Sequence, residues 1–573
     1  MAFGIFPKYE DIFPGIQLPD LDEVLSRTSS KDLLKAVAFM NSKVHLSQTN
    51  LAEQEDILWK WIYPFAEPTR FEVKKNYILF KKHTQRQGHQ VILFASATLL
   101  RLTERIILNF NDLPEKHKKD IEDEMTLFEA WLIINSIFDA DVVKGLDPVI
   151  ANLPDMLLVN QASQYEFIHT KDVIYQTLLA KSFFVFLSEN EKLKNYLVEF
   201  LANKQVKNPN EYLSHLLTVY GEGISGRSFG FGIPDEAVHV IPFFDSIAYD
   251  LAAHTFSDLA AKHQPDSDFK LLRSRPLIKE VNGNYYPLHN NFFVDKIYQG
   301  LLFDFFQHSS IKATHKTFGD FLQLLGQDFA ESHLFYGYVA ECFPPKKYVV
   351  TVPGNQFNEF EYSDYYARQG NKLFLFEFKN SIMNAQVKQS RDAARIKAEI
   401  FKKLVYSPDN NRRKGVGQLI NVIQNIEEGG FEFYDFAARE IRSLIIYPII
   451  VYTDDFFSLD GIQNIVSDEF SKLLKERPVR RHKVRNVTLV HLRDIIDMQF
   501  LIQSSKTTIS DIMQVYFTRK KDIIRKRPRN QQEHLAKLKG FRSIMHDIVL
   551  PYSDKKALLK RLATALDFNT PRV

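Results

Sequence analysis

The chain has 573 residues, with 73 Lys and Arg against 70 Asp and Glu, a hydrophobic share of 45% and one cysteine. One hydrophobic core stops growing near ~250–300 residues, so this length predicts two or three compact units. Apolar runs end short of the ~20 residues that span a bilayer, and we see no secretion signal, so we expect neither a membrane protein nor a secreted one. Because Cys342 is alone, an internal disulfide and a cysteine-based zinc site are excluded, which favours a cytoplasmic location.

Charge is divided unevenly along the chain. Residues 1–300 carry 31 Lys and Arg against 39 Asp and Glu, whereas residues 301–573 carry 42 against 31. A basic second half is what phosphate binding needs, because affinity for nucleic acid is largely electrostatic. Basic patches are also common on ordinary soluble domains, so charge alone leaves both readings open.

Residues 1–300 are predicted to be mostly helical. Apolar residues recur there at three- and four-residue spacing, the period of an amphipathic helix. The segments are residues 33–46, 56–63, 90–110, 121–138 and 173–201. The glycine-rich residues 220–234 lack the Gly-Lys-Ser/Thr ending of a phosphate loop, so a plain loop is favoured. We expect this region to serve regulation, sensing or assembly, through a protein partner or a second copy of the chain.

From about residue 312 the pattern mixes helices and strands. In chain order it predicts a helix at 318–343, strands at 348–352, 357–367 and 372–379, helices at 385–405 and 418–428, a strand at 442–452, a helix at 459–475 and a strand at 486–492. We therefore expect an α+β multidomain protein. Its parts would be a mostly α-helical region at 1–300, an α/β domain with a mixed sheet at 312–500 and a basic helical segment at 501–573.

Two of these strands form a predicted hairpin. Gly370-Asn371 between two β-rich runs is a signal for a two-residue turn, and its register places Asp364 directly opposite Glu377 on one face. Two carboxylates facing each other repel. Mg²⁺ or Mn²⁺ would offset the repulsion, because such an ion binds one or two carboxylates and completes its shell with water and phosphate oxygens. Asp364 and Glu377 are thus the predicted metal ligands.

Lys379 completes the predicted site. Strand side chains alternate, so Lys379 shares the face of Glu377, while the phenylalanines at 374, 376 and 378 face a core. A bound metal lowers the pKa of its water, and Lys379 could orient that water or stabilise charge on a phosphate. The plainer alternative is a solvent-facing hairpin with surface ion pairs. The matched register and the aromatic opposite face favour the site.

This hairpin resembles the signature of the PD-(D/E)XK nuclease superfamily, which has a restriction-endonuclease-like fold. The resemblance covers roughly residues 316–495, with Asp364, Glu377 and Lys379 at the motif positions and Ser363 where proline is frequent. It implies an α-β-β-β-α-β core and a metal-dependent nuclease. No subfamily is identified.

Two further residues enter through the resemblance alone. The family often has a glutamate on the helix before the sheet, and Glu331 resembles it although it stands one position late. Some branches have a glutamine downstream of the lysine, and Gln418 is the candidate. For Gln418, an ordinary residue at a helix start is an equally good reading. Both are included among the predicted catalytic residues.

Basic clusters in the second half are candidate nucleic-acid contacts. The residues are Lys388, Arg391, Arg395, Arg412, Arg413, Lys414, Arg480, Arg481, Lys483, Arg525 and Arg527. Any one of these clusters alone would be an ordinary solvated surface. Four of them in the half that holds the hairpin favour a groove that follows phosphates. Such contacts position a nucleic acid without reading its sequence.

The leading interpretation is a Mg²⁺- or Mn²⁺-dependent nuclease, with DNA favoured over RNA as substrate. A large additional domain fused to such a nuclease is reminiscent of prokaryotic restriction and antiviral defence proteins. The alternative is a catalytically silent nucleic-acid-binding or scaffold protein that keeps the nuclease fold. A third reading, a helical interaction protein with an incidental hairpin, fits the mixed second half least well.

Overall fold

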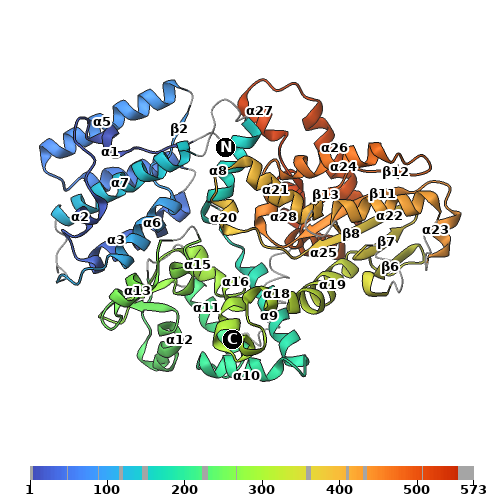
Figure 1. Ribbon diagram of the computed structural model, residues 1–573, viewed down its shortest axis with the longest axis horizontal. Coiled ribbons are helices and arrows are strands. Elements are labelled where there is room, and N and C mark those ends of the chain that lie inside the picture. Colours follow the sequence, from blue (N-terminus) through green and yellow to red (C-terminus); the bar gives the residue numbers. More distant parts are fainter. Residues whose placement is uncertain are drawn as a thin grey trace. The chain divides into compact units, whose positions relative to one another are not determined.

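The computed structural model describes residues 4–47, 50–87, 89–114, 121–144, 153–168, 170–221, 230–265, 268–356, 363–407, 412–429, 435–505 and 507–552 (Figure 1). The chain forms two compact units. The first comprises Met1–Leu146 and Glu166–Thr314, and the second comprises Asp147–Tyr165 and His315–Val573. The division falls within one helix, α8 (Leu153–Ile168), whose residues up to Tyr165 pack with the second unit.

The first unit is built mainly from helices, as its periodicity predicts. They are α1 (Tyr9–Ile12), α2 (Leu21–Leu25), α3 (Ser30–Ser47), α4 (Leu51–Ile62), α5 (Glu67–Arg86), α6 (Ser96–Leu108), α7 (Ile121–Lys144), α9 (Val173–Glu189), α10 (Lys194–Asn203), α11 (Pro209–Val219), η2 (Asp235–Val240), α12 (Ile241–Asp245), α13 (Phe256–Lys262), α14 (Lys270–Ser274), α15 (Asn290–Asp295), α16 (Gln299–His308) and α17 (Ile311–Thr314). Residues 173–201 thus form two helices, because α9 ends at its C-cap Asn190, which has an extended backbone.

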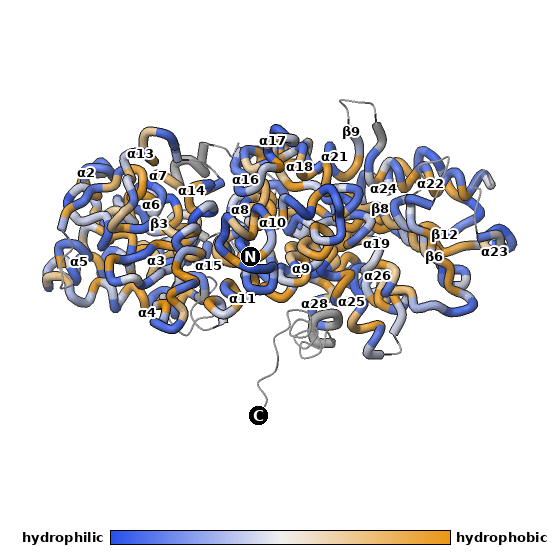
Figure 2. The backbone as a smooth tube through the Cα atoms, turned by 90° about the horizontal axis from the view of Figure 1, so that it is seen from below, coloured by the Kyte–Doolittle hydropathy of each residue, from blue (hydrophilic) through white to orange (hydrophobic). Residues whose placement is uncertain are grey.

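Large aromatic side chains fill the core of the first unit. Four of them pack with ring centroids 4.9 to 6.2 Å apart: Trp61 of α4, Phe94 just before α6, and Phe128 and Trp131 of α7. Figure 2 shows hydrophobic residues gathered inside each unit. Burying aromatic rings of this size is a major source of stability.

Short strands in the first unit were not predicted. β3 (Ala248–Asp250), β4 (Leu277–Lys279) and β5 (Tyr285–Pro287) form one small sheet, and β1 (Gly4–Ile5) pairs with β2 (Gln90–Val91). Runs of two or three residues are too short to show an alternating pattern. Of the glycine-rich segment, residues 222–229 lie outside the described residues.

The second unit alternates helices and strands. Its elements are α18 (Phe318–Leu325), η3 (Gly326–Phe335), α19 (Tyr336–Glu341), β6 (Val349–Pro353), η4 (Gly354–Gln356), β7 (Tyr365–Gln369), β8 (Lys372–Lys379), α20 (Ala385–Lys388), α21 (Ala393–Leu404), β9 (Tyr406–Ser407), β10 (Arg412–Arg413), α22 (Val416–Glu428), α23 (Phe436–Glu440), β11 (Ile445–Tyr452), η6 (Asp455–Ser458), α24 (Ile462–Glu476), β12 (Lys483–Val484), β13 (Thr488–His491), α25 (Leu492–Ser504), α26 (Ile509–Arg525), α27 (Gln531–Ala536) and α28 (Phe541–Tyr552). The expected α+β class is confirmed, and the predicted strand at 357–367 is described only from residue 363.

A mixed sheet organises this unit. Its order is β12-β11-β8-β7-β6, with β13 also paired to β11. β6, β7 and β8 are antiparallel neighbours, whereas β8 and β11 run parallel from the pair Lys372–Ile445 to the pair Lys379–Tyr452. The carboxyl ends of β8 and β11 therefore meet at one edge, which is where open α/β sheets commonly bind ligands.

Both faces of β8 are covered. On one face Phe374 and Phe376 contact Phe343, and Phe378 stacks on Phe335 of η3 with centroids 4.7 Å apart. The aromatic face is thus core, as predicted. Leu373 and Leu375 of the other face are fully buried too, on the side that carries Glu377 and Lys379.

The C-terminal helices belong to the same unit as the sheet. α28 packs on α25, α26 and β13, so residues up to 552 do not stand apart as a separate body. Within the described part of the chain, no helix is both long and apolar enough to cross a membrane.

Candidate functional site

The hairpin has the predicted register. Gln369 pairs with Lys372 across Gly370-Asn371, and the ladder continues to the pair Tyr365–Phe376. Gly370 has a φ of +64°, a backbone conformation that glycine adopts without strain. One step further along the same register is Asp364, opposite Glu377.

Asp364 is held at the bend that precedes β7. Its Oδ2 accepts a hydrogen bond of 2.5 Å from the Phe378 amide, and its carbonyl accepts one of 2.8 Å from the Gly354 amide. A Cβ atom at position 354 would lie 2.9 Å from the carbonyl oxygens of Ser363 and Asp364. Glycine is therefore required at position 354 for η4 to support Asp364 this closely.

Glu377 and Lys379 lie together at the end of β8. The Lys379 Nζ donates to Glu377 Oε1 at 2.6 Å, with the Glu377 side chain 1% exposed and that of Lys379 16% exposed. Lys379 also donates to Gln418 Oε1 at 3.3 Å. The carboxylate is thus deep and the ammonium lies at the rim.

Gln418 is fixed by the start of α22. Its Oε1 also accepts a 2.8 Å hydrogen bond from the Gly415 amide. Gly415 has a φ of +46°, and a Cβ there would lie 2.1 Å from the Leu404 carbonyl oxygen, so only glycine fits this turn. The tight turn therefore delivers Gln418 to the lysine, and the structure brings this predicted residue to the site.

The carboxylate of Asp364 is electrostatically strained. Burial, then the negative charge of Glu377 and that of Glu331, raises its pKa well above the ordinary range. Lys379 and the Phe378 amide act in the opposite direction without cancelling this effect. Lys379 and the Phe378 amide therefore do not fully compensate the negative charges of the carboxylates at this site.

Glu331 comes to the site through a π-helix. In η3 the Tyr336 amide donates to the Glu331 carbonyl, an i→i−5 bond, and the Tyr336 hydroxyl donates to Glu331 Oε1 at 2.5 Å. A π-turn takes one more residue than an α-turn, so a glutamate placed one position late can still face Asp364.

The donor set fits a hard divalent cation. Among the described residues no three His, Cys, Asp or Glu side chains gather closely enough to hold a metal by themselves. Asp364 and Glu377 supply two carboxylates, and Mg²⁺ or Mn²⁺ accepts one or two with water and phosphate oxygens in its other positions. A cation bound there would offset the burial and the carboxylate repulsion that raise the pKa of Asp364.

Two of the predicted basic contacts are buried instead. Lys388 is 6% exposed, with its Nζ 5.7 Å from the centre of the Tyr165 ring of α8, and Arg391 is 9% exposed. Neither side chain lines an exposed groove. The sequence could not predict this burial, because α8 comes from the first half of the chain and packs with the second unit.

A second group of the predicted nucleic-acid contacts lies at the end of the sheet opposite to Glu377. Lys483 of β12 pairs with Ile445, which pairs with Lys372 at the start of β8. Glu377 is five residues further on, about 17 Å away at the rise of a strand. Arg480 and Arg481 precede Lys483 in the chain, and their backbone amides donate to the Glu427 carboxylate.

The remaining basic residues divide by position. Arg412 and Arg413 form β10, and Lys414 follows directly before α22 and Gln418, so these three are chain neighbours of the site. Arg395 is exposed in the first turn of α21. Arg525 and Arg527 are exposed at and beyond the end of α26, whose start, at Ser510, bonds Lys372 far from Glu377.

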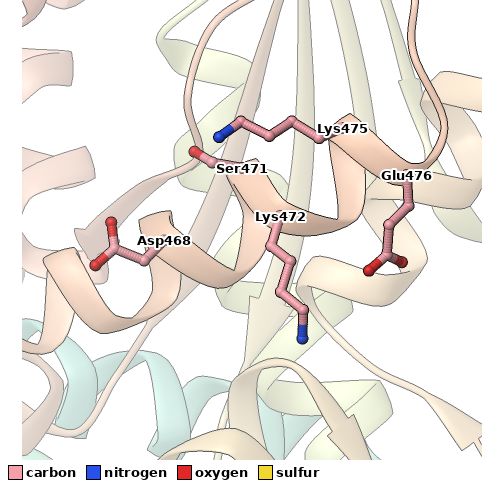
Figure 3. Close-up of a pocket in the computed structure, with 5 residues that line it drawn as sticks. All are labelled: Asp468, Ser471, Lys472, Lys475 and Glu476. Carbon is pink, nitrogen blue, oxygen red and sulfur yellow. The ribbon is translucent and has the colours of Figure 1, made fainter.

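An open surface pocket lies elsewhere in this unit. All its lining residues come from one helix, α24, and they are Asp468, Ser471, Lys472, Lys475 and Glu476 (Figure 3). None of them belongs to the carboxylate site, and their charges are of both signs, so this pocket carries no part of the predicted chemistry.

Sequence reasoning missed the residues that support the site. Tyr336 and Gly354 were not predicted, although a tyrosine five residues after Glu331 would be a signal if the π-helix were known. No known protein family, characterised protein or solved structure matches this chain.

Proposed function

We propose that the second unit is a metal-dependent nuclease of the PD-(D/E)XK type, acting on DNA in preference to RNA. One observation carries the proposal: the half-buried Asp364 and the buried Glu377 meet Lys379 and Gln418 at the carboxyl end of a central strand. Two carboxylates placed together out of water cost free energy unless a cation or a proton offsets them.

The element order supports the same proposal. Helices η3 and α19 precede the antiparallel β6, β7 and β8, helices follow, and β11 then pairs parallel with β8. This is the α-β-β-β-α-β order that the sequence resemblance implies. Fold alone does not establish activity, so the proposal depends on the site.

Each site residue has a role in this proposal. Asp364 and Glu377 would hold Mg²⁺ or Mn²⁺, which supplies an acidified water and charge neutralisation at the phosphate. Lys379 keeps a positive charge at the rim, where it orients the attacking water or stabilises the developing phosphate charge. Gln418 positions the lysine, and the Phe378 amide positions Asp364.

A catalytically silent nucleic-acid-binding protein is the competing function. The Lys379–Glu377 ion pair favours it, because a lysine bound to its own carboxylate can also be purely structural. The buried charge of Glu377 beside Asp364 favours catalysis, since replacing buried charges by apolar residues is often neutral or stabilising.

Cleavage assays separate the two functions. Supercoiled plasmid, single-stranded DNA and RNA are incubated with Mg²⁺ or Mn²⁺ and the native chain, Asp364→Asn, Lys379→Met or Lys475→Ala. Lys475 is exposed on α24 in the same unit and serves as the control. The proposal expects metal-dependent cleavage by the native chain and the control only. Binding without cleavage by the native chain would establish the silent function instead.

A further inference from the structure

A cluster of buried polar side chains in the first unit has no role in the proposed nuclease. Asn41 and His45 lie four residues apart on one face of α3, and His289 precedes α15. Asn41 and His289 are 1% exposed and His45 is 7% exposed. The rings of His45 and His289 lie 5.6 Å apart, centre to centre.

Five polar atoms of this cluster have no hydrogen-bond partner among the described residues. They are both amide atoms of Asn41, Nδ1 of His45 and both ring nitrogens of His289. The other nitrogen of His45 contacts the Thr170 hydroxyl at 3.3 Å. Leaving a buried polar atom unpaired costs about 1–3 kcal/mol. Several such atoms in one place indicate a bound group that pairs with them.

The spacing of the rings suits one shared ion. Imidazole nitrogens bind zinc at about 2.0–2.1 Å, which puts two ring centres about 5–6 Å apart when they share an ion. Both rings are buried, which disfavours their charged form, and the neutral imidazole is the form that ligates metals.

The charged side chains near the cluster are paired with one another. Arg273 pairs with Glu166 and Asp295 and lies 3.8 Å from Asp268, and Lys171 pairs with Asp295. Carboxylates therefore compensate the two cations that act on His289, and a divalent ion would be held by its nitrogen and oxygen ligands and not by surplus negative charge.

Aromatic side chains flank His289. Phe292 and Phe167 pack against it, with ring centres 5.1 and 6.1 Å away. These phenylalanines offer no ligand atoms, so an ion bound here would take its ligands from the imidazoles and Asn41. The soft nitrogen donors select zinc-class metals over Mg²⁺, whose preferred ligands are oxygens.

We propose that His45, His289 and the amide oxygen of Asn41 bind one transition-metal ion of the zinc class inside the first unit. This site is separate from the carboxylate site of the second unit in residues and in metal preference. It makes the helical region a zinc-binding module, whatever the activity of the second unit.

Zinc binding by the full chain tests this proposal. The metal-free protein is titrated with Zn²⁺ in excess Mg²⁺, and bound zinc is counted by elemental mass spectrometry. We expect one zinc per chain, lost in His45→Gln and in His289→Gln and kept in His263→Gln, an exposed histidine of the same unit. Absence of zinc from the native chain, or equal binding by all variants, overturns the proposal.

A variant that should bind zinc more tightly distinguishes loss of a ligand from loss of the fold. Asn41→Asp exchanges a neutral oxygen ligand for a carboxylate, so its affinity for zinc should rise about tenfold, the order of effect of a changed metal environment. A misfolded protein would not bind more tightly. Unchanged or weaker binding by Asn41→Asp contradicts the assignment of Asn41. Zinc lost through Asp364→Asn instead would place the metal in the second unit and refute the site.

Discussion

Replacing Asp364 by asparagine should stabilise the metal-free second unit while abolishing its activity. Asp364 and Glu377 occupy opposed positions one step beyond the last ladder pair, where Cβ atoms are about 5 Å apart. At an effective dielectric constant of about 20, two like charges at that separation repel by about 3 kcal/mol. Asparagine keeps an oxygen that accepts from the Phe378 amide. Since Lys379 already offsets part of the repulsion, we expect a gain of about 1–3 kcal/mol in the free energy of unfolding.

The gain should depend on pH with a defined sign. The folded-state pKa of Asp364 is raised, so the folded state binds a proton more readily than the unfolded chain. Stability is then fullest at acidic pH and falls as pH rises through the folded pKa. Asp364→Asn should therefore stabilise more at alkaline pH than at acidic pH, where the native carboxyl holds its proton.

Hydrogen exchange of the β8 peptide is the assay, with a chelator present. All three tryptophans lie at positions 59, 61 and 131, so their fluorescence reports the first unit instead. Asp468→Asn, an exposed change on α24, is the control and should stay within about 0.5 kcal/mol of the native chain. A destabilised Asp364→Asn, or a gain that is the same at alkaline and acidic pH, would refute the reasoning.

Three further predictions concern two residues that support the carboxylate site and a buried histidine of the first unit. Gly354→Ala should lower the cleavage rate about a hundredfold, since its Cβ would displace Asp364, and circular dichroism should show an intact fold; native-like cleavage would contradict this support role. Tyr336→Phe, which frees Glu331, should raise the Mn²⁺ concentration needed for half-maximal cleavage more than it lowers the maximal rate; an unchanged metal dependence would count against it. The metal-free first unit should lose at least about 3 kcal/mol as pH falls from 6.5 to about 4, because burial lowers the pKa of His45 to about 4 and also lowers that of His289. Tryptophan fluorescence during urea unfolding should show a smaller loss in His45→Gln; a loss as large as in the native chain would contradict this.

The hairpin was predictable because its signals are local. Gly370-Asn371 defines the turn, the turn defines the register, and alternation along Lys372–Lys379 then assigns each side chain to a face. The predicted and observed bounds of β8 agree. Placement of Asp364 opposite Glu377 followed from these facts without knowledge of the rest of the fold.

Other features depend on contacts between distant segments. The position of Lys483 follows from the parallel pairing of β12 with β11, which no local pattern reveals. Lys388 is buried by Tyr165, more than two hundred residues earlier in the chain. The winding of η3, which turns Glu331 and Tyr336 toward each other, also depends on tertiary packing.

The most direct test of the central claim is the single-turnover cleavage rate of a labelled DNA oligonucleotide as Mn²⁺ is increased. If Asp364, Glu377 and Lys379 form a metal-dependent site, the native rate rises from zero to a plateau, and Glu377→Gln and Lys379→Met stay near zero at every concentration. A native rate independent of Mn²⁺, or a Glu377→Gln variant as fast as the native chain, would contradict the account.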